Sequence, residues 1–294
     1  MTEIINQPTK STQGNTAVPT ACANCAVHNL ANLQRLGVDM ENWDYVLALA
    51  GNPNVGKSTV FNALTGLRQH TGNWPGKTVG RAEGGYDYGE KRYKIVDLPG
   101  TYSLLATSPD EEVARDFILF GQPDVTVVVI DATRMERNLN LVLQVLQITD
   151  RVVVCVNLID EARRHGLQVD ERRLARDLGV PVVLTAARQR EGLDLLIQTI
   201  HEIATGQVVG KPVRQAIEPP EVRQAIDTLV DQIHALYPDL PNARWVALRL
   251  LDGDETIIQA LRRGELGQLT QNNNQIAARQ EPLPQSAENL KVLE

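Results

Sequence analysis

The sequence predicts an α/β domain with a mostly parallel sheet, followed by a small all-helical domain, and three observations support this. Five short apolar runs lie between residues 46 and 186. Segments with helical periodicity separate them, and strands that alternate with helices of about 10–15 residues are typical of βαβ units. After residue 219, apolar residues recur only at helical spacing.

The five apolar runs are the predicted buried strands, since parallel strands covered on both faces are apolar throughout. They are VLALAG (46–51), YKIVDLPG (93–100), VTVVVIDA (125–132), VVVCVN (152–157) and VPVVLTA (180–186). Helices are predicted near 57–67, 110–120, 137–148, 170–178 and 191–205. Residues 83–88 are predicted to add an antiparallel edge strand.

Changes in composition divide the chain into four predicted parts. Residues 1–44 form a flexible polar extension with a C-x-x-C pair, and residues 45–210 form the α/β domain. Residues 211–268 form the helical domain, in which three apolar stripes predict three helices. Residues 269–294 are a polar tail that ends in the start of a truncated helix capped by Ser286.

Composition and charge exclude several classes of protein. With 43% hydrophobic residues in 294, the chain is not wholly disordered, and three cysteines exclude a disulfide-stapled secreted scaffold. A net charge of −7 without a basic tract argues against a nucleic-acid partner. The sequence has neither a signal-like start nor an apolar run near the about 20 residues of a membrane span. We therefore expect a cytoplasmic location.

The segment GNPNVGKS, Gly51 to Ser58, fits the phosphate-binding pattern G-x-x-x-x-G-K-[ST] between a strand and a helix. Its backbone N–H groups would surround a phosphate chain. Lys57 would reach the β- and γ-phosphates, and the Ser58 hydroxyl would bind Mg²⁺. The predicted phosphate-binding residues here are Asn52, Asn54, Val55, Gly56, Lys57, Ser58 and Thr59.

The segment DLPG, Asp97 to Gly100, ends the second apolar run about 40 residues after the phosphate loop. Asp97 could hold the Mg²⁺ shell through water, and the Gly100 N–H could meet a γ-phosphate. We expect Asp97, Leu98, Pro99 and Thr101 to form a switch segment.

The segments NLID and TAA end the fourth and fifth apolar runs and predict a guanine site. The Asp160 carboxylate can accept both the N1–H and the 2-amino group of guanine, a donor pair that adenine lacks. The alternative is that Asp160 only caps a helix. Backbone N–H groups of TAA could bind the guanine oxygen. The predicted guanine-binding residues are Asn157, Leu158, Asp160, Thr185, Ala186 and Ala187.

These four motifs resemble the TRAFAC-class P-loop GTPases over residues 45–206. The segments GNWPGKTVGRAEG (72–84), DLPGTYSL (97–104) and ARWVALRLLDGDE (243–255) further resemble the FeoB-type ferrous iron transporters. The resemblance implies that Thr78, in a switch with Gly76 and Lys77, binds Mg²⁺, and that Asn54 binds K⁺. The alternative for Asn54 is that it only shapes the loop through its own backbone bonds.

Several positions depart from the family pattern. Leu158 stands where most of these GTPases have a lysine, so we expect weaker nucleotide affinity and faster release. Lys77 and Gly80 replace an aliphatic residue and a glutamate. Thr101 stands where Ras-like proteins place a water-orienting glutamine, and this implies slow turnover.

The resemblance implies a slow, Mg²⁺-dependent and K⁺-stimulated GTPase that regulates Fe²⁺ passage through a membrane pore. The pore domain would follow residue 294 or be a separate chain, and would hold the protein at the inner membrane. The sequence is compatible with both a monomer and a homo-oligomer. One alternative is a soluble assembly-type GTPase with no transport role, and another is a nucleotide-sensing binding module in which turnover is incidental.

Other residues gave further predictions. Cys22, Cys25 and His28 could bind Zn²⁺ or Fe²⁺, or the cysteines could be reduced thiols on a polar arm. Cys155 is predicted to be buried, Trp74 to be exposed in the first switch, and His201 to lie on the surface.

Overall fold

The computed structural model describes residues 33–34, 36–66, 69–105, 108–213, 219–238, 240 and 242–262. Within these ranges, no helix combines the length and the apolar character that a bilayer crossing requires. Cys22, Cys25, His28 and the predicted final helix lie outside the described residues.

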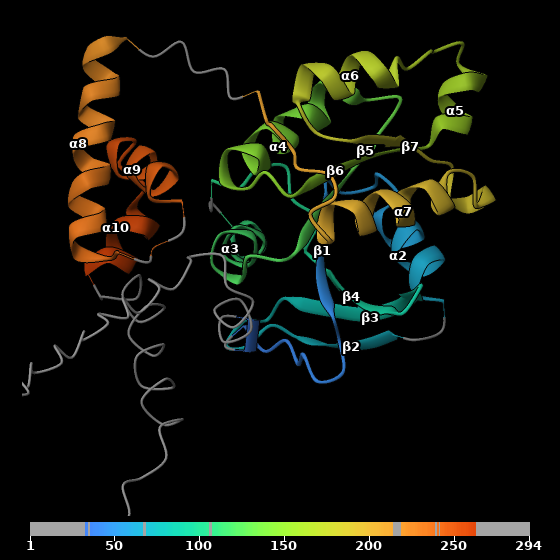
Figure 1. Ribbon diagram of the computed structural model, residues 1–294, viewed down its shortest axis with the longest axis horizontal. Coiled ribbons are helices and arrows are strands. Elements are labelled where there is room, and N and C mark those ends of the chain that lie inside the picture. Colours follow the sequence, from blue (N-terminus) through green and yellow to red (C-terminus); the bar gives the residue numbers. More distant parts are fainter. Residues whose placement is uncertain are drawn as a thin grey trace, which may run out of the picture.

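A seven-stranded sheet in the order β2-β3-β4-β1-β5-β6-β7 forms the first domain (Figure 1). The five strands from β4 to β7 run parallel, whereas β2 and β3 pair antiparallel. The mostly parallel sheet is thereby confirmed. The strands are β1 (Tyr45–Gly51), β2 (Gln69–Asn73), β3 (Gly80–Tyr88), β4 (Lys91–Asp97), β5 (Val125–Asp131), β6 (Val152–Asn157) and β7 (Val182–Leu184).

The antiparallel part of the sheet differs from the prediction. The predicted edge strand over residues 83–88 is the longer β3, and it is not at the edge, because β2 pairs with its outer side. The β2 sequence QHTGN is polar and has no apolar alternation. Pairing with β3, rather than side-chain burial, explains why these residues are extended.

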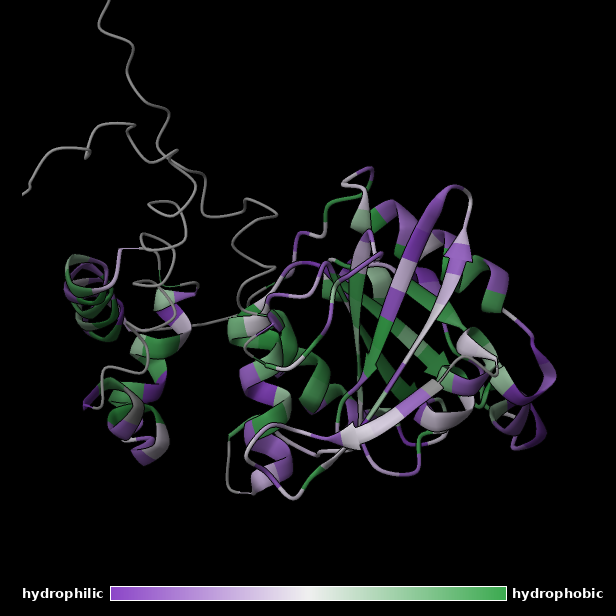
Figure 2. Ribbon diagram, turned by 90° about the horizontal axis from the view of Figure 1, so that it is seen from below, coloured by the Kyte–Doolittle hydropathy of each residue, from purple (hydrophilic) through white to green (hydrophobic). Residues whose placement is uncertain are grey.

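Helices cover both faces of the sheet and create two apolar cores. One core contains α2 (Lys57–Thr65) and α7 (Leu193–Ala204). The other contains α3 (Pro109–Asp116), α4 (Met135–Ile148), α5 (Ile159–Arg164) and the end of α6 (Glu171–Leu178). Figure 2 shows hydrophobic residues along the central strands and on parts of the helices that cover them.

The predicted helix near 110–120 consists of two parts. Ser108 caps α3 by accepting a hydrogen bond from the Glu111 N–H, and Pro109 starts the helix. The helix then widens into a π-helix, η1 (Phe117–Gly121), which ends at left-handed Gln122. This π-helix turns Phe117 and Ile118 into the core.

The second domain is helical, as predicted. It contains α8 (Pro220–Leu236), α9 (Ala243–Leu251) and α10 (Glu255–Arg262). Ile226, Ile233, Trp245 and Ile257 are buried, so each predicted apolar stripe contributes to the packing. The Arg115 guanidinium on α3 donates a hydrogen bond to the Thr256 hydroxyl on α10, 2.8 Å away, and so connects the two domains.

Candidate functional site

The phosphate loop joins β1 to α2 through two left-handed residues, Asn54 and Gly56. Gly56 has a φ of 81°, and a Cβ there would lie 2.4 Å from Asn157 Nδ2. Only glycine therefore fits, since any side chain would be both strained and in collision. Asn54, Ser58 and Thr59 are exposed, whereas Asn52 and Val55 are buried.

Lys57 is the first residue of α2 and Asp97 is the last residue of β4, and the two meet although they are 40 residues apart in the sequence. The Lys57 ammonium donates to the Asp97 carboxylate and to the Leu98 carbonyl oxygen, which lies 2.6 Å away. Burial raises the pKa of the Asp97 carboxyl, and the Lys57 charge offsets part of that rise. The predicted phosphate-binding lysine and Mg²⁺-binding aspartate thus share one charged site.

The DLPG segment passes directly over the phosphate loop. A Cβ on Gly100 would lie 3.4 Å from Pro53 Cα, so the two backbones nearly touch. The Thr101 N–H donates to the Gly51 carbonyl oxygen (3.2 Å), and its hydroxyl donates to the Ser103 carbonyl oxygen (2.9 Å). The Thr101 side chain is buried, and its hydroxyl is already hydrogen-bonded within the DLPG region.

Asn157 connects the guanine motifs to the phosphate loop. Its amide nitrogen donates to the Val55 carbonyl oxygen at 3.1 Å. Its amide oxygen accepts from the Thr185 hydroxyl at 3.2 Å and from the Ala187 N–H at 3.1 Å. One buried side chain thus holds three of the four predicted motifs together.

A cavity of about 540 Å³ opens beside Asn157. Asp160 lies in its wall, where one carboxylate oxygen accepts from Arg164 Nη2 (2.9 Å) and from Gln189 Nε2 (3.0 Å). Leu158 lines the same cavity in a left-handed conformation. The lining residues are Thr59, Asn157, Leu158, Asp160, Glu161, Arg164, Ala187, Arg188 and Gln189.

The predicted first switch is the turn of the β2–β3 hairpin. The Trp74 N–H donates to the Val79 carbonyl oxygen, and the Lys77 N–H donates to the Trp74 carbonyl oxygen, each at 3.0 Å. Gly76 is left-handed, with a φ of 69°, and Thr78 is exposed. The Lys77 ammonium pairs with Glu112 on α3 at 2.7 Å.

Two predictions about single side chains were wrong. Trp74 is only 4% exposed, because its ring packs edge-on against Phe117 and lies under the Arg81 guanidinium. His201 is half-buried rather than on the surface, and its Nδ1 shares a hydrogen bond with the Tyr93 hydroxyl.

Cys155 is fully buried as predicted, and burial raises the pKa of its thiol to about 12. Within the described ranges, no group of three or more His, Cys, Asp or Glu residues could hold a metal ion. The proposed metal ligands Cys22, Cys25 and His28 lie outside those ranges.

The sequence reasoning missed Arg164 and Gln189 as partners of Asp160. Arg164 follows Asp160 by one helical turn on α5, a spacing that places two side chains together and could have been recognised. Gln189 comes from η2 (Ala187–Gln189), directly after the TAA motif. Its contact depends on the tertiary fold, and no signal in the sequence predicts it.

Comparison with known proteins gives matches over both domains. Residues 45–200 match the family described as ferrous iron transport protein B, and residues 219–289 match the FeoB cytosolic helical domain. The Fe(2+) transporter FeoB of Salmonella typhimurium is 40% identical over 212 residues, which are 71% of this chain. The chain corresponds to 27% of the length of that relative.

Solved structures also match this chain. The cytosolic domain of T. maritima FeoB in its apo form is 36% identical, with a TM-score of 0.67 over 76% of this chain and 86% of that chain. The same domain in a GMPPNP form is 33% identical, with a TM-score of 0.66 over 83% of this chain and 89% of that chain. The cytosolic domain of L. pneumophila FeoB is 34% identical, with a TM-score of 0.67 over 76% of this chain and 88% of that chain.

Proposed function

The chain belongs to the FeoB family of ferrous iron transport proteins, and on that premise we propose that it binds guanine nucleotides and hydrolyses GTP slowly. Hydrolysis regulates the passage of Fe²⁺ through a membrane-embedded pore, which is attached to this chain or separate from it. We assign the GTPase domain to residues 45–210 and the helical domain to residues 211–268. The match of the second domain to the FeoB helical domain favours this function over a soluble assembly-type GTPase.

The observation that carries the proposal is the convergence of four distant motifs on one edge of the sheet. Asn157 bonds the phosphate loop and the TAA segment, while Lys57 bonds the DLPG segment. In open α/β sheets, ligands bind at the carboxyl ends of the strands. A nucleotide placed there has its phosphates at Lys57 and its base in the cavity beside Asp160.

The residues at the phosphate end suit Mg²⁺ and K⁺, which prefer hard oxygen ligands. The Ser58 and Thr78 hydroxyls are the proposed Mg²⁺ ligands, and the Asp97 carboxylate would hold the Mg²⁺ shell through water. A buried carboxylate such as Asp97 gains from a nearby cation. Asn54 is exposed in the phosphate loop, and its amide oxygen is the proposed K⁺ ligand. When bound, both ions neutralise charge on the phosphates.

In hydrolysis, the residues of this chain bind and orient the phosphates. Lys57 leaves Asp97 and binds the phosphates as a point charge, and the Gly100 N–H orients the γ-phosphate. The hydroxyl of Thr101 is bonded to Ser103, so this side chain does not position the attacking water. Slow turnover follows, because nothing in the DLPG segment replaces the water-orienting glutamine of Ras-like proteins.

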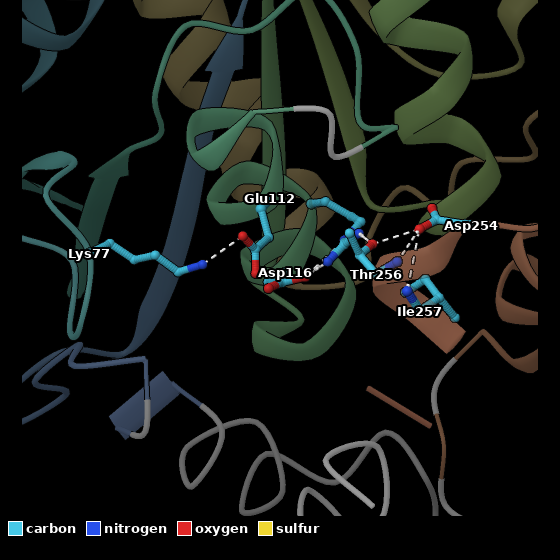
Figure 3. Close-up of polar contacts among 7 residues, drawn as sticks. Lys77, Glu112, Asp116, Asp254, Thr256 and Ile257 are labelled. Carbon is cyan, nitrogen blue, oxygen red and sulfur yellow. Dashed lines mark hydrogen bonds and ion pairs between the residues drawn. The ribbon is translucent and has the colours of Figure 1, made fainter. Parts of the chain in front are cut away.

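A chain of polar contacts supports signalling from the first switch to the helical domain (Figure 3). Lys77 pairs with Glu112 on α3, and Arg115 on the same helix binds Asp116 at 2.7 Å. Arg115 also donates to Thr256, whose hydroxyl donates to Asp254 at 2.6 Å. A movement of the switch that displaces α3 would therefore reach α10.

The test is steady-state GTP hydrolysis by this chain in KCl and in NaCl at equal ionic strength, with Mg²⁺. We expect clear stimulation by K⁺ in the wild type and its loss in Asn54→Ala. Asn242→Ala, which changes another exposed left-handed asparagine far from the loop, is the matched control. Equal rates in both salts would contradict the K⁺ role, and failure to bind GTP or GDP would contradict the function.

A further inference from the structure

A short segment that precedes the α/β domain is bonded to the first switch hairpin. We name this segment, residues 36–39, the clasp. The Arg81 guanidinium on β3 donates to the Leu36 carbonyl oxygen at 2.9 Å and to the Gly37 carbonyl oxygen at 2.8 Å. The Lys94 ammonium on β4 donates to the Asp39 carbonyl oxygen. Three of the four clasp carbonyls, those of Leu36, Gly37 and Asp39, are thus held by two cations of the sheet.

The cations that hold the clasp are largely buried. The side chains of Arg81, Glu83 and Lys94 are 16%, 12% and 8% exposed, and Glu83 pairs with both cations at 2.9 and 2.7 Å. One carboxylate cannot satisfy all the donors of an arginine and a lysine, and an unmade bond to a buried charge is costly. The clasp carbonyls therefore complete the solvation of these two cations.

The clasp also touches the switch turn itself. Gly37 is left-handed, with a φ of 78°, and a Cβ there would lie 2.8 Å from both Arg81 Nη1 and Pro75 Cγ. The same Arg81 guanidinium stands 5.3 Å from the centre of the Trp74 ring. The backbone at Gly37 is therefore packed against the segment that precedes Thr78, at a distance that only glycine permits.

The clasp is anchored on its other side by the π-helix. Leu33 is 2% exposed, and a Cβ built on Gly121 would lie 3.0 Å from the Leu36 side chain. The match to the family's GTPase domain begins at residue 45, so the clasp is an addition outside that domain. It holds the hairpin from outside without occupying any part of the proposed nucleotide site.

We propose that the clasp is a positioning element for the first switch. It stabilises the hairpin turn around Trp74 and Pro75, and it thereby disfavours the rearrangement that brings Thr78 to the metal and the γ-phosphate. The proposal rests on the proposed function. Because GDP lacks the γ-phosphate, the clasp changes the affinity for GTP and leaves the affinity for GDP unchanged.

The test uses Gly37→Ala in the full chain, because its Cβ would push the clasp away from Arg81 and Pro75. Gly89→Ala is the matched control: Gly89 is also left-handed, at 58°, but has no atom within 4 Å of a built Cβ. Both variants suffer the same kind of backbone strain, and only one disturbs the clasp. Arg81→Lys is a milder second variant, which keeps the charge beside Glu83 and loses the forked contact.

Two quantities are measured for each variant: the dissociation constants of GDP and of a non-hydrolysable GTP analogue, and amide hydrogen exchange over residues 69–80. For Gly37→Ala we expect about threefold or tighter binding of the analogue, a shift of roughly 0.7 kcal/mol, with GDP binding unchanged. Exchange over 69–80 should become faster without nucleotide. Arg81→Lys should shift both quantities in the same direction by less, and Gly89→Ala should resemble the wild type.

Equal shifts for GDP and the analogue would overturn the proposal, since general destabilisation would affect both nucleotides alike. Unchanged binding and exchange in Gly37→Ala would overturn it as well. If the wild type bound no guanine nucleotide, the proposed function would fail, whereas the exchange comparison would still report whether the clasp holds the hairpin. The two failures are therefore distinguishable.

Discussion

The base end and the phosphate end of the proposed nucleotide site are built differently, although both lie at the same edge of the sheet. At the base end, Asn157 is buried and its amide group is bonded to three backbone or hydroxyl groups. At the phosphate end, Lys57 is bonded to Asp97 and Leu98, which it must leave to reach a phosphate. The Asn157 contacts can remain when a base binds, whereas Lys57 must leave both of its partners before it can bind phosphates.

This contrast suggests that the base end recognises guanine, whereas the phosphate end responds to the γ-phosphate. Rigid hydrogen bonds at the base end hold the discriminating groups in place and keep the cost of binding low. The Lys57–Asp97 ion pair at the phosphate end can be exchanged for contacts with phosphate, and a γ-phosphate favours the second arrangement. Variants at the two ends should therefore change different properties.

The largest effect is expected at the phosphate end, from Lys57→Ala. This change removes the point charge proposed for the β- and γ-phosphates, and the loss of one partner of such a pair costs about 2–5 kcal/mol, or roughly 30-fold to several thousandfold. Titration calorimetry with GTP checks this. Lys91→Ala, which loses only an exposed pair with Asp44, is the control, and equal affinity in the two variants would refute the role.

The next effect is expected at the base end, from Asp160→Asn. The amide keeps one acceptor and gains a donor, so it no longer matches both guanine donors and instead suits the second carbonyl of xanthine. Selectivity for GDP over xanthosine diphosphate should fall by about 100-fold. Competition binding measures the ratio. Asp177→Asn on the exposed face of α6 should leave it unchanged.

A smaller effect is expected in the pH dependence of stability, from Asp97→Asn. Burial raises the pKa of Asp97 in the folded chain above the about 3.9 of an unfolded aspartate. Between these two pKa values the Asp97 carboxyl binds more protons in the folded state, so its contribution to the free energy of unfolding decreases as pH rises.

Urea unfolding across this interval tests the sign. The free energy of unfolding of the wild type minus that of Asp97→Asn should decrease as pH rises, because the variant has no proton to lose at this position. Asp177→Asn, whose side chain is 56% exposed, should follow the wild type. Parallel curves for the wild type and Asp97→Asn would show that burial does not control this carboxyl.

The smallest effect is expected from Gln189→Ala. Gln189 donates to the Asp160 oxygen that also binds Arg164, so it occupies an acceptor site that guanine needs. Its removal should tighten GDP binding by about threefold, the value of one exposed hydrogen bond. Gln198→Ala, which removes an exposed contact on α7, is the control, and titration calorimetry with GDP measures both variants. Weaker GDP binding would mean that Gln189 supports the base instead.

The parallel strands could be predicted because their signal is local. A run such as VVVCVN is apolar along its whole length, and burial on both faces requires that. The polar strand β2 could not be predicted, because its conformation comes from pairing with β3. Likewise, the burial of Trp74 depends on Phe117, 43 positions away, and no local pattern carries that information.

The candidate site followed the same rule. The spacing of the four motifs predicted which residues meet, since a phosphate loop dictates its own backbone geometry. The motif spacing did not predict which other side chains bind those residues. The pairing of Lys77 with Glu112 and that of Asp160 with Gln189 join segments whose approach is set by the whole fold.

The close approach of Gly56 to Asn157 has a consequence for protein engineering. A Cβ at position 56 would collide with the Asn157 amide. These two positions, 101 residues apart, therefore constrain each other where the phosphate end of the site meets the base end. A chimera that imports a different base-reading segment must keep the asparagine together with the glycine. An exchanged segment that includes one of these two positions must therefore keep the residue that fits the other.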